Sequence, residues 1–83
     1  MRKAVVLIRL KPSLMDAQGA VIKRALLQLG YNSVVDVRVG KLIELMLEEE
    51  DEGKVVAKVK EMCERLLANP IIEGYEVLVE DTK

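Results

Sequence analysis

The single cysteine, Cys63, is the first side chain to test for chemistry, because a thiolate can act as a nucleophile or a metal ligand. A reactive thiolate needs a base or a cation beside it, and a metal site needs further ligands. The chain has no histidine and no second cysteine. Cys63 lies between Val59 and Leu66 on the apolar side of a predicted helix. We therefore interpret Cys63 as a small core residue.

Two other patterns could bind ions or phosphate. The acidic run Glu48–Glu52 lacks the alternate spacing and the turn-forming glycine of calcium loops, so we assign it to the start of a helix, where the dipole favours acids. Gly40-Lys41 lies in extended chain and not at the start of a helix, as a phosphate-binding loop requires. We therefore expect no catalytic residue, no metal site and no bound cofactor on this chain, and predict a binding or assembly part.

The composition restricts the partners further. The 83 residues predict one domain, 1–83, with an aliphatic core, since Phe and Trp are absent. The chain has thirteen basic and fourteen acidic residues, so its net charge is close to zero and would not attract nucleic acid or an anionic membrane. RNA-binding sheets stack bases on aromatic side chains, and the predicted strands carry Val, Leu and Ile instead. The apolar run Ala4–Ile8 is too short for a signal peptide or a membrane span, and we expect a cytoplasmic protein.

A leucine pair, a Gly-Tyr pair and alternating valines occur in the same order twice, at 26–37 and at 66–79. Two such β-α-β units predict an α+β protein on the β-α-β-β-α-β ferredoxin-like plan, with an antiparallel sheet and two helices on one face. Asp16 is the predicted N-cap of the first helix and Gly30 its stop. Asn69-Pro70 ends the second helix.

The stretch 34–48 has two interpretations. Its odd positions are apolar on both sides of Gly40, which disfavours a two-residue hairpin there. A three-residue loop, Arg38-Val39-Gly40, keeps the parity, and so does one long strand kinked at Gly40. A fifteen-residue strand spans roughly 50 Å, more than so small a domain covers. We favour the long strand, half of it lying on a partner subunit.

The second face of the predicted sheet also indicates association. A sheet covered by helices on one side normally shows water a polar second face, whereas this one is about half apolar. We therefore predict a homodimer or a higher oligomer. The apolar residues of this face are Val5, Leu7, Val34, Leu42, Met46 and Leu78.

Five phrases follow one another over nearly the whole length of the chain: Val6-Leu7-Ile8-Arg9-Leu10-Lys11, Met15-Asp16-Ala17-Gln18-Gly19, Ala25-Leu26 to Leu29-Gly30-Tyr31, Val37-Arg38-Val39-Gly40-Lys41, and Leu67-Ala68-Asn69-Pro70-Ile71-Ile72-Glu73 with Tyr75. In the order and spacing of these phrases the chain resembles the PurS family, the small subunit of phosphoribosylformylglycinamidine synthase. Ala17 departs from that family, which usually has proline there.

The resemblance implies a non-catalytic subunit of a glutamine-dependent ligase in purine biosynthesis. A glutaminase subunit would release ammonia, a large synthetase subunit would use ATP and Mg, and the small subunit would bridge the two. The candidate partner contacts are Arg38, Lys41, Asn69 and Glu73, although Asn69 could serve only as a helix cap and Arg38 only as a cross-sheet partner. One alternative is a small-molecule-sensing regulatory domain of ferredoxin-like fold. An acylphosphatase-like hydrolase would need an arginine in a Gly-rich phosphate loop, which no arginine here has.

Overall fold

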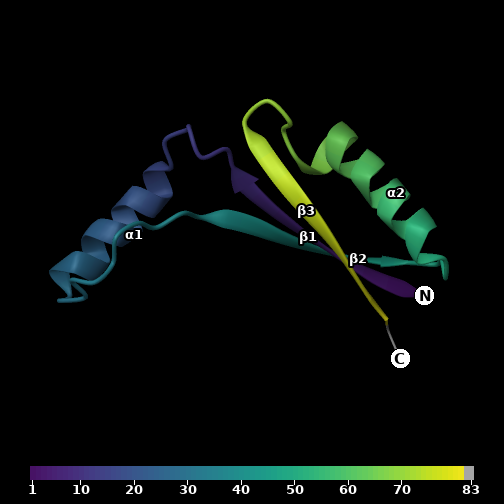
Figure 1. Cartoon of the computed structure of the whole chain (residues 1–83), viewed down its shortest axis with the longest axis horizontal. Helices are drawn as coiled ribbons and strands as arrows, with labels where there is room; N and C mark the ends of the chain where they lie inside the picture. Colours follow the sequence, from purple (N-terminus) through teal and green to yellow (C-terminus); the bar gives the residue numbers. More distant parts are fainter. Residues whose placement is uncertain (82–83) are drawn as a thin grey trace.

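A computed structural model describes residues 1–81 and has three strands and two main helices (Figure 1). Asp16 caps the first helix by accepting a hydrogen bond from the Gly19 N–H, and Gly30 adopts a positive φ of 99° just after its end, as predicted. Asp51 caps the second helix in the same way through the Lys54 N–H. In chain order the elements are β1 (Arg2–Leu10), α1 (Ala17–Gln28), β2 (Gly40–Leu47), α2 (Glu52–Met62), the π-helix η1 (Cys63–Leu67) and β3 (Glu73–Asp81).

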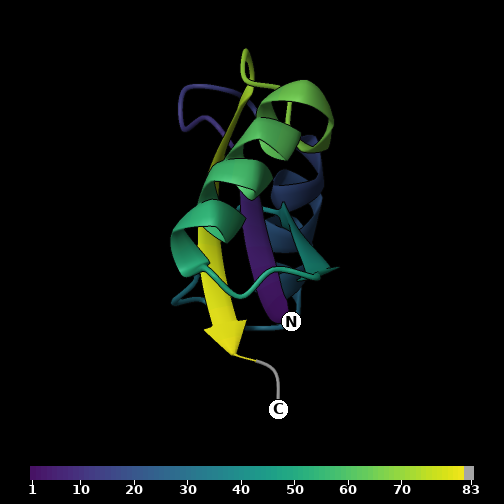
Figure 2. The ribbon, with the colours of Figure 1, turned by 90° about the vertical axis from the view of Figure 1, so that its right-hand side faces the viewer.

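The strands form one antiparallel sheet in the order β2-β1-β3. Val6 lies opposite Ile43 on one side and Val77 on the other, so these three side chains share a face of the sheet. The α2 helix covers that face, lying in front of β1 and β3 in Figure 2. We name this unit, β1, β2, β3, α2 and η1, the body. The predicted α+β class and antiparallel sheet are confirmed.

The body encloses a small aliphatic core. Ala4, Val6 and Ile8 from β1 are almost fully buried against α2, and the half-buried residues of β2 and β3 surround them. Cys63 is fully buried in the same core, which agrees with its interpretation as a core residue. The core cluster consists of Ala4, Val6, Ile8, Val55, Val59, Cys63 and Ala68.

The end of the second helix differs from the predicted apolar stripe. Its last turn is a π-helix, closed by a bond from the Ala68 N–H to the Cys63 carbonyl. The wider turn rotates the following side chains relative to an α-helix. Leu66, predicted on the core face, is consequently 81% exposed, while Leu67 is half-buried.

The first helix lies elsewhere than predicted. In Figure 1, α1 lies beyond the end of the sheet, and the return segment 31–39 runs back along it towards β2. We name α1 and this segment, residues 17–39, the arm. The prediction that both helices cover one face of the sheet is therefore wrong for α1 within a single chain, because the chain does not fold back at Gly40.

Residues 34–39 continue into β2 without a reversal, so the extended segment is one long stretch and not a hairpin (Figure 1). Only its second half, Gly40–Leu47, pairs with β1. The molecule is accordingly elongated, with extents of 48 × 31 × 14 Å and a radius of gyration of 16.2 Å. A compact chain of this length would have a radius of gyration of about 12 Å.

Candidate functional site

Three of the four predicted contact residues meet at one end of the sheet, where β2 and β3 begin. Lys41 Nζ lies 3.6 Å from Glu73 Oε2. The other carboxylate oxygen of Glu73, Oε1, accepts a hydrogen bond of 2.7 Å from the Asn69 N–H. The side chain of Glu73 is only 13% exposed, whereas that of Lys41 is 62% exposed. Glu73 therefore has a structural role, and Lys41 presents its charge to the surface.

Asn69 holds the turn between η1 and β3. Its Oδ1 accepts a hydrogen bond of 3.1 Å from the Ile71 N–H, and its carbonyl accepts from the N–H groups of Ile72 and Glu73. An asparagine side chain that bonds the backbone two residues on is a common way to build a turn. These bonds give Asn69 a local role in the turn, and its contact with a partner stays a prediction.

Arg38 does not pair across the sheet. Its guanidinium donates to the carbonyls of Leu14 and Lys11, at 3.0 and 3.2 Å, and so ties the return segment to the loop after β1. The carbonyl groups orient the guanidinium, and its charge also acts on the Asp16 carboxylate, whose pKa it helps to lower. Arg38 is thus both a structural tie and a fixed positive charge at the junction of arm and body.

Asp16 is a second tie at this junction, and the sequence showed only half of its role. Besides capping α1 at 2.8 Å through Gly19, its carboxylate accepts a hydrogen bond of 2.5 Å from the Val39 N–H. These two backbone bonds, Val39 first, hold the pKa of Asp16 below its ordinary value. A side chain at Gly19 would collide with the Val37 carbonyl, so glycine lets α1 lie against the return segment. The close approach at Gly19 is thus made to the arm's own return segment and not to the sheet.

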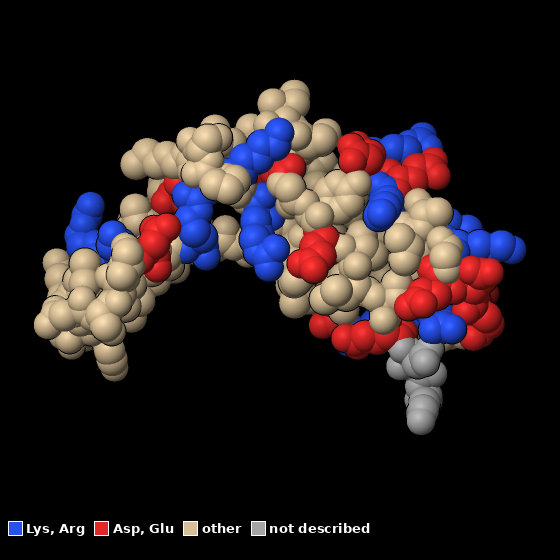
Figure 3. Space-filling view, in the orientation of Figure 1, with Lys and Arg blue, Asp and Glu red and all other residues tan. Residues whose placement is uncertain are grey.

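The junction also contains a pocket with a volume of about 470 Å³. Arg9, Arg38 and Lys41 are among the residues that line it, and Arg9 is ion-paired with Glu76 and Lys41 with Glu73. Figure 3 shows basic side chains at this junction with acidic side chains beside them, and further acidic and basic side chains at the opposite end of the body. The lining residues are Leu7, Ile8, Arg9, Leu10, Pro12, Arg38, Val39, Gly40, Lys41 and Leu42.

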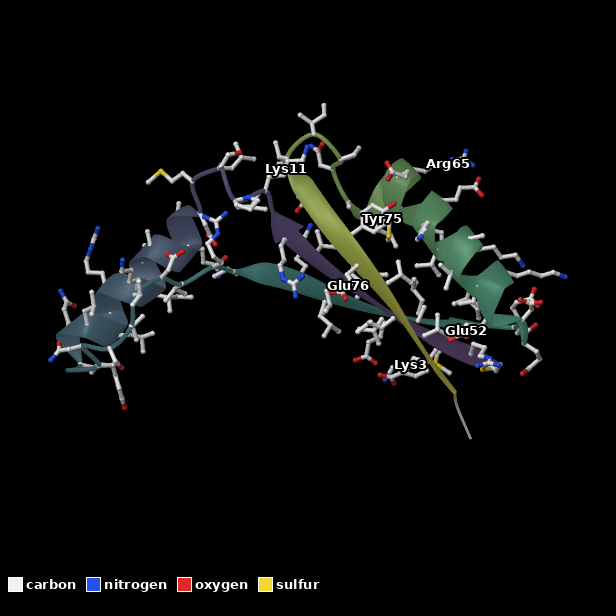
Figure 4. All side chains as sticks on the ribbon, viewed as in Figure 1. Lys3, Lys11, Glu52, Arg65, Tyr75 and Glu76 are labelled. Carbon is white, nitrogen blue, oxygen red and sulfur yellow. The ribbon has the colours of Figure 1, made fainter. Side chains whose placement is uncertain are left out.

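Sequence reasoning missed Arg9 as a member of this site. Its position at the charged end of an otherwise apolar strand face was the available signal, but the partners across the sheet were needed to interpret it. Arg9 lies 3.7 Å from Glu76 on β3, beyond hydrogen-bonding distance. In Figure 4, Glu76 extends from β3, whereas Tyr75, its neighbour in sequence, lies between β3 and α2.

The remaining candidates for chemistry have local explanations. Burial, helped by the charge of Glu64, raises the pKa of the Cys63 thiol, which opposes formation of a reactive thiolate. The Tyr75 hydroxyl donates to Glu64 at 2.7 Å. In the described part of the chain, no group of three His, Cys, Asp or Glu side chains is placed to hold a metal ion. Among the same residues, none of the helices is both long and apolar enough to cross a membrane.

The chain is similar to known proteins over nearly its whole length. The family model of PurS, phosphoribosylformylglycinamidine (FGAM) synthase, matches residues 3–81. The phosphoribosylformylglycinamidine synthase subunits PurS of Methanocaldococcus jannaschii and Bacillus subtilis are each 48% identical to it, over 96% and 98% of this chain and 96% and 95% of their own lengths.

Solved structures agree with this similarity. The crystal structure of Methanocaldococcus jannaschii PurS, described as one of the subunits of formylglycinamide ribonucleotide amidotransferase in the purine biosynthetic pathway, superimposes with a TM-score of 0.91 at 46% identity and covers 100% of both chains. A chain in the structure of PurLQS from Thermotoga maritima superimposes with a TM-score of 0.85 at 32% identity, over 96% of this chain and 99% of that one.

Proposed function

The chain belongs to the PurS family of phosphoribosylformylglycinamidine synthase subunits, and we propose that it is the non-catalytic subunit that joins a glutaminase to an ATP-dependent synthetase. The observation that carries this proposal is a match of family and structure over the full length, which includes a chain solved within PurLQS. The relatives named above are synthase subunits, so a small-molecule-sensing regulatory domain is not favoured.

In this proposal the chain holds its partners so that ammonia passes between them. The glutaminase releases ammonia, and the large synthetase subunit activates the amide oxygen of formylglycinamide ribonucleotide with ATP and Mg and adds the ammonia. The pKa of the Cys63 thiol is raised by burial, and the Glu73 carboxylate accepts a bond from the Asn69 N–H, which supports a role in positioning the partners. We place the assembly in the cytoplasm.

We further propose that the working form is a homodimer in which two copies exchange their arms. The return segment 34–39 is extended but makes no ladder within its own chain, and β2 is an edge of the sheet with β1 on one side only. An edge strand with unpaired backbone groups pairs readily with another strand. If each arm paired with the β2 edge of the other copy, both sheets would gain a fourth strand, and each α1 would lie beside the other copy's α2.

Exposed apolar side chains on the arm support this exchange. Val35 is 84% exposed and Leu29 is 74% exposed in the single chain. Tyr31 is 59% exposed. Contiguous apolar surface of this kind marks an interface, and a second copy presents the matching uncovered edge. The sheet that results is the four-stranded β-α-β-β-α-β plan that the sequence predicts.

The charges on the two surfaces also match. The arm, residues 17–39, contains three basic residues, Lys23, Arg24 and Arg38, against one acidic residue, Asp36. The body has the five consecutive acids Glu48–Glu52 directly after β2. Antiparallel pairing of the exchanged segment with β2 brings the outer end of a basic arm beside this acidic run. Opposite charges then favour association of the two copies over their separation.

The proposed function is tested by measuring glutamine-dependent turnover of the large subunit and the glutaminase with and without this chain. The chain alone should hydrolyse neither glutamine nor ATP. Added to the other two subunits it should raise glutamine-dependent synthesis, and excess ammonia should bypass much of the requirement for it. Equal rates with and without the chain would contradict the bridging role.

A further inference from the structure

We propose that the junction of arm and body is a lock that keeps the arm extended, so that each chain completes its sheet with a second copy and not with itself. The inference rests on the arm exchange proposed above and deepens it, because it names what disfavours the alternative. In that alternative the chain reverses at residues 38–40, and the return segment pairs with the β2 edge of its own body. This closed monomer would contain the same strands and helices as one half of the dimer.

The apolar pattern does not choose between the two arrangements. The chain's own β2 edge and the edge of a second copy present the same backbone groups and would cover the same exposed side chains, such as Val35 and Leu29. A surface on the same chain also has an effective concentration of about millimolar, far above a micromolar concentration of second copies. Without a restraint, the arm would therefore close on its own body.

Two side chains restrain the chain where a reversal would have to form. The Asp16 carboxylate accepts hydrogen bonds from the Val39 N–H at 2.5 Å and from the Gly19 N–H at 2.8 Å, so it joins the last residue before β2 to the start of α1. The Arg38 guanidinium donates to two carbonyls of the loop after β1, at 3.0 and 3.2 Å. Hydrogen bonds in which one group is charged are stronger than neutral ones, so the adjacent residues 38 and 39 are both held firmly.

Gly40, the next residue, is held in extended chain. It lies opposite Arg9 in the ladder, and its backbone is not in the left-handed region, which among the described glycines only Gly30 adopts. A three-residue loop over 38–40 would require Gly40 in the left-handed conformation. Closure would thus break the pairing of Gly40 as well as the two ties.

Gly19 fixes the direction of α1. A Cβ atom there would collide with the Val37 carbonyl, so the backbones of α1 and the return segment touch. A helix that covers a sheet stands off from it, because side chains fill the space between the two backbones. Direct backbone contact therefore requires α1 to lie beside the return segment, beyond the end of the sheet, as in Figure 1. An arm in this position reaches a second body and not its own.

The test inserts Pro-Asp between Val39 and Gly40, which creates the turn sequence Pro-Asp-Gly. In this junction insertion, Val39 and Lys41 face each other across a three-residue loop, and the odd apolar positions of both segments stay on one face. The control is a tip insertion, with Pro-Asp placed between Asn32 and Ser33 at the exposed outer end of the arm. It adds the same residues and leaves the junction unchanged.

Sedimentation gives the mass of each variant at micromolar concentration, and amide hydrogen exchange gives the protection of residues 34–39. The unmodified chain and the tip insertion should be dimers. The junction insertion should be a folded monomer in which 34–39 stays protected, because this segment then pairs with its own β2. Protection within a monomer distinguishes a closed chain from an open one that has only lost its partner.

A second pair of variants removes one tie without changing the length of the chain. Arg38→Met keeps much of the bulk of the side chain and loses both hydrogen bonds, so the dimer dissociation constant should rise about tenfold. Arg24→Met, on α1, removes the same charge from the arm and touches neither tie, so it should change the constant much less. This pair decides the question if the insertion prevents folding.

Three results would overturn the inference. A junction insertion that dimerises as tightly as the unmodified chain would show that the junction does not decide between the two forms, and would leave arm exchange intact. A monomer with unprotected 34–39 would show that the arm does not close. Equal dissociation constants for Arg38→Met and Arg24→Met would show that the tie does not hold the arm. If the unmodified chain is itself a monomer, arm exchange and the lock fail together, whereas the bridging function is judged by glutamine-dependent turnover alone.

Discussion

In the body, Val6 and Val59 are fully enclosed, whereas in the arm Val35 is 84% exposed and Leu29 is 74% exposed. All four are aliphatic residues in regular alternating or helical patterns, so sequence alone treats them alike. In the body, α2 covers the apolar residues of β1 and β3. The arm has the same kind of pattern without a surface of its own chain to cover it. An apolar pattern alone thus does not show whether a residue is covered by its own chain.

The largest expected effect is in the body and sharpens this contrast. Ile8→Ala removes a side chain that is 1% exposed at the centre of the core. It should lower the free energy of unfolding by about 3 kcal/mol, since the lost contacts leave a cavity between the sheet and α2. Chemical denaturation at a fixed protein concentration measures the change. Ile71→Ala is the control of the same residue type, at a turn position that is 79% exposed. Similar costs for the two would show that the body core does not dominate stability.

The second expected effect is in the arm and is visible only in association. Val35→Asp places a charge on a side chain that the single chain leaves exposed, so a monomer should tolerate it. If a second copy covers the arm, the buried charge should weaken dimerisation about a hundredfold. Sedimentation over a range of concentrations measures this. Met15→Asp is the matched control, because Met15 is also 84% exposed but precedes the helix and the strand pattern. A dimer unaffected by Val35→Asp would contradict arm exchange.

The sequence predicted most of the local structure because local signals determine it. The cap at Asp16, the stop at Gly30 and the end of η1 before Asn69-Pro70 depend on residues within one turn of each boundary. The π-turn after Cys63 was not predictable, because its i→i+5 bond leaves no distinct apolar spacing. The sequence left the direction of the chain at Gly40 open, because the alternation of apolar residues in 34–48 permitted both a loop and a continuous strand.

The candidate site was predicted in part for a related reason. Lys41, Asn69 and Glu73 were identified, and the structure brings them together from β2, the turn and β3. Arg9 and the second bond of Asp16 were missed. Both depend on the approach of segments far apart in sequence, since Asp16 meets Val39 across 23 positions. Long-range contacts of this kind are determined by tertiary packing and not by local pattern.

The smallest expected effect concerns the two helix caps, one in the arm and one in the body. Asp16→Ala removes both the cap of α1 and the bond to Val39, so it should lower the melting temperature by on the order of 5 °C. Asp51→Ala removes only the cap bond to Lys54 and should lower it less.

The pKa of Asp16 is lowered in the folded chain, so the stability that its carboxylate contributes is present above the ordinary Asp pKa of about 4. This contribution is lost as the pH falls through the lower, folded value. The difference between the unmodified chain and Asp16→Ala should therefore shrink on acidification, as scanning calorimetry from neutral to acidic pH can measure. A difference that is constant with pH would mean that Asp16 acts through packing and not through its charge. Because Asp16 holds the arm at its angle to the body, Asp16→Ala should also weaken dimerisation, whereas Asp51→Ala should leave it unchanged.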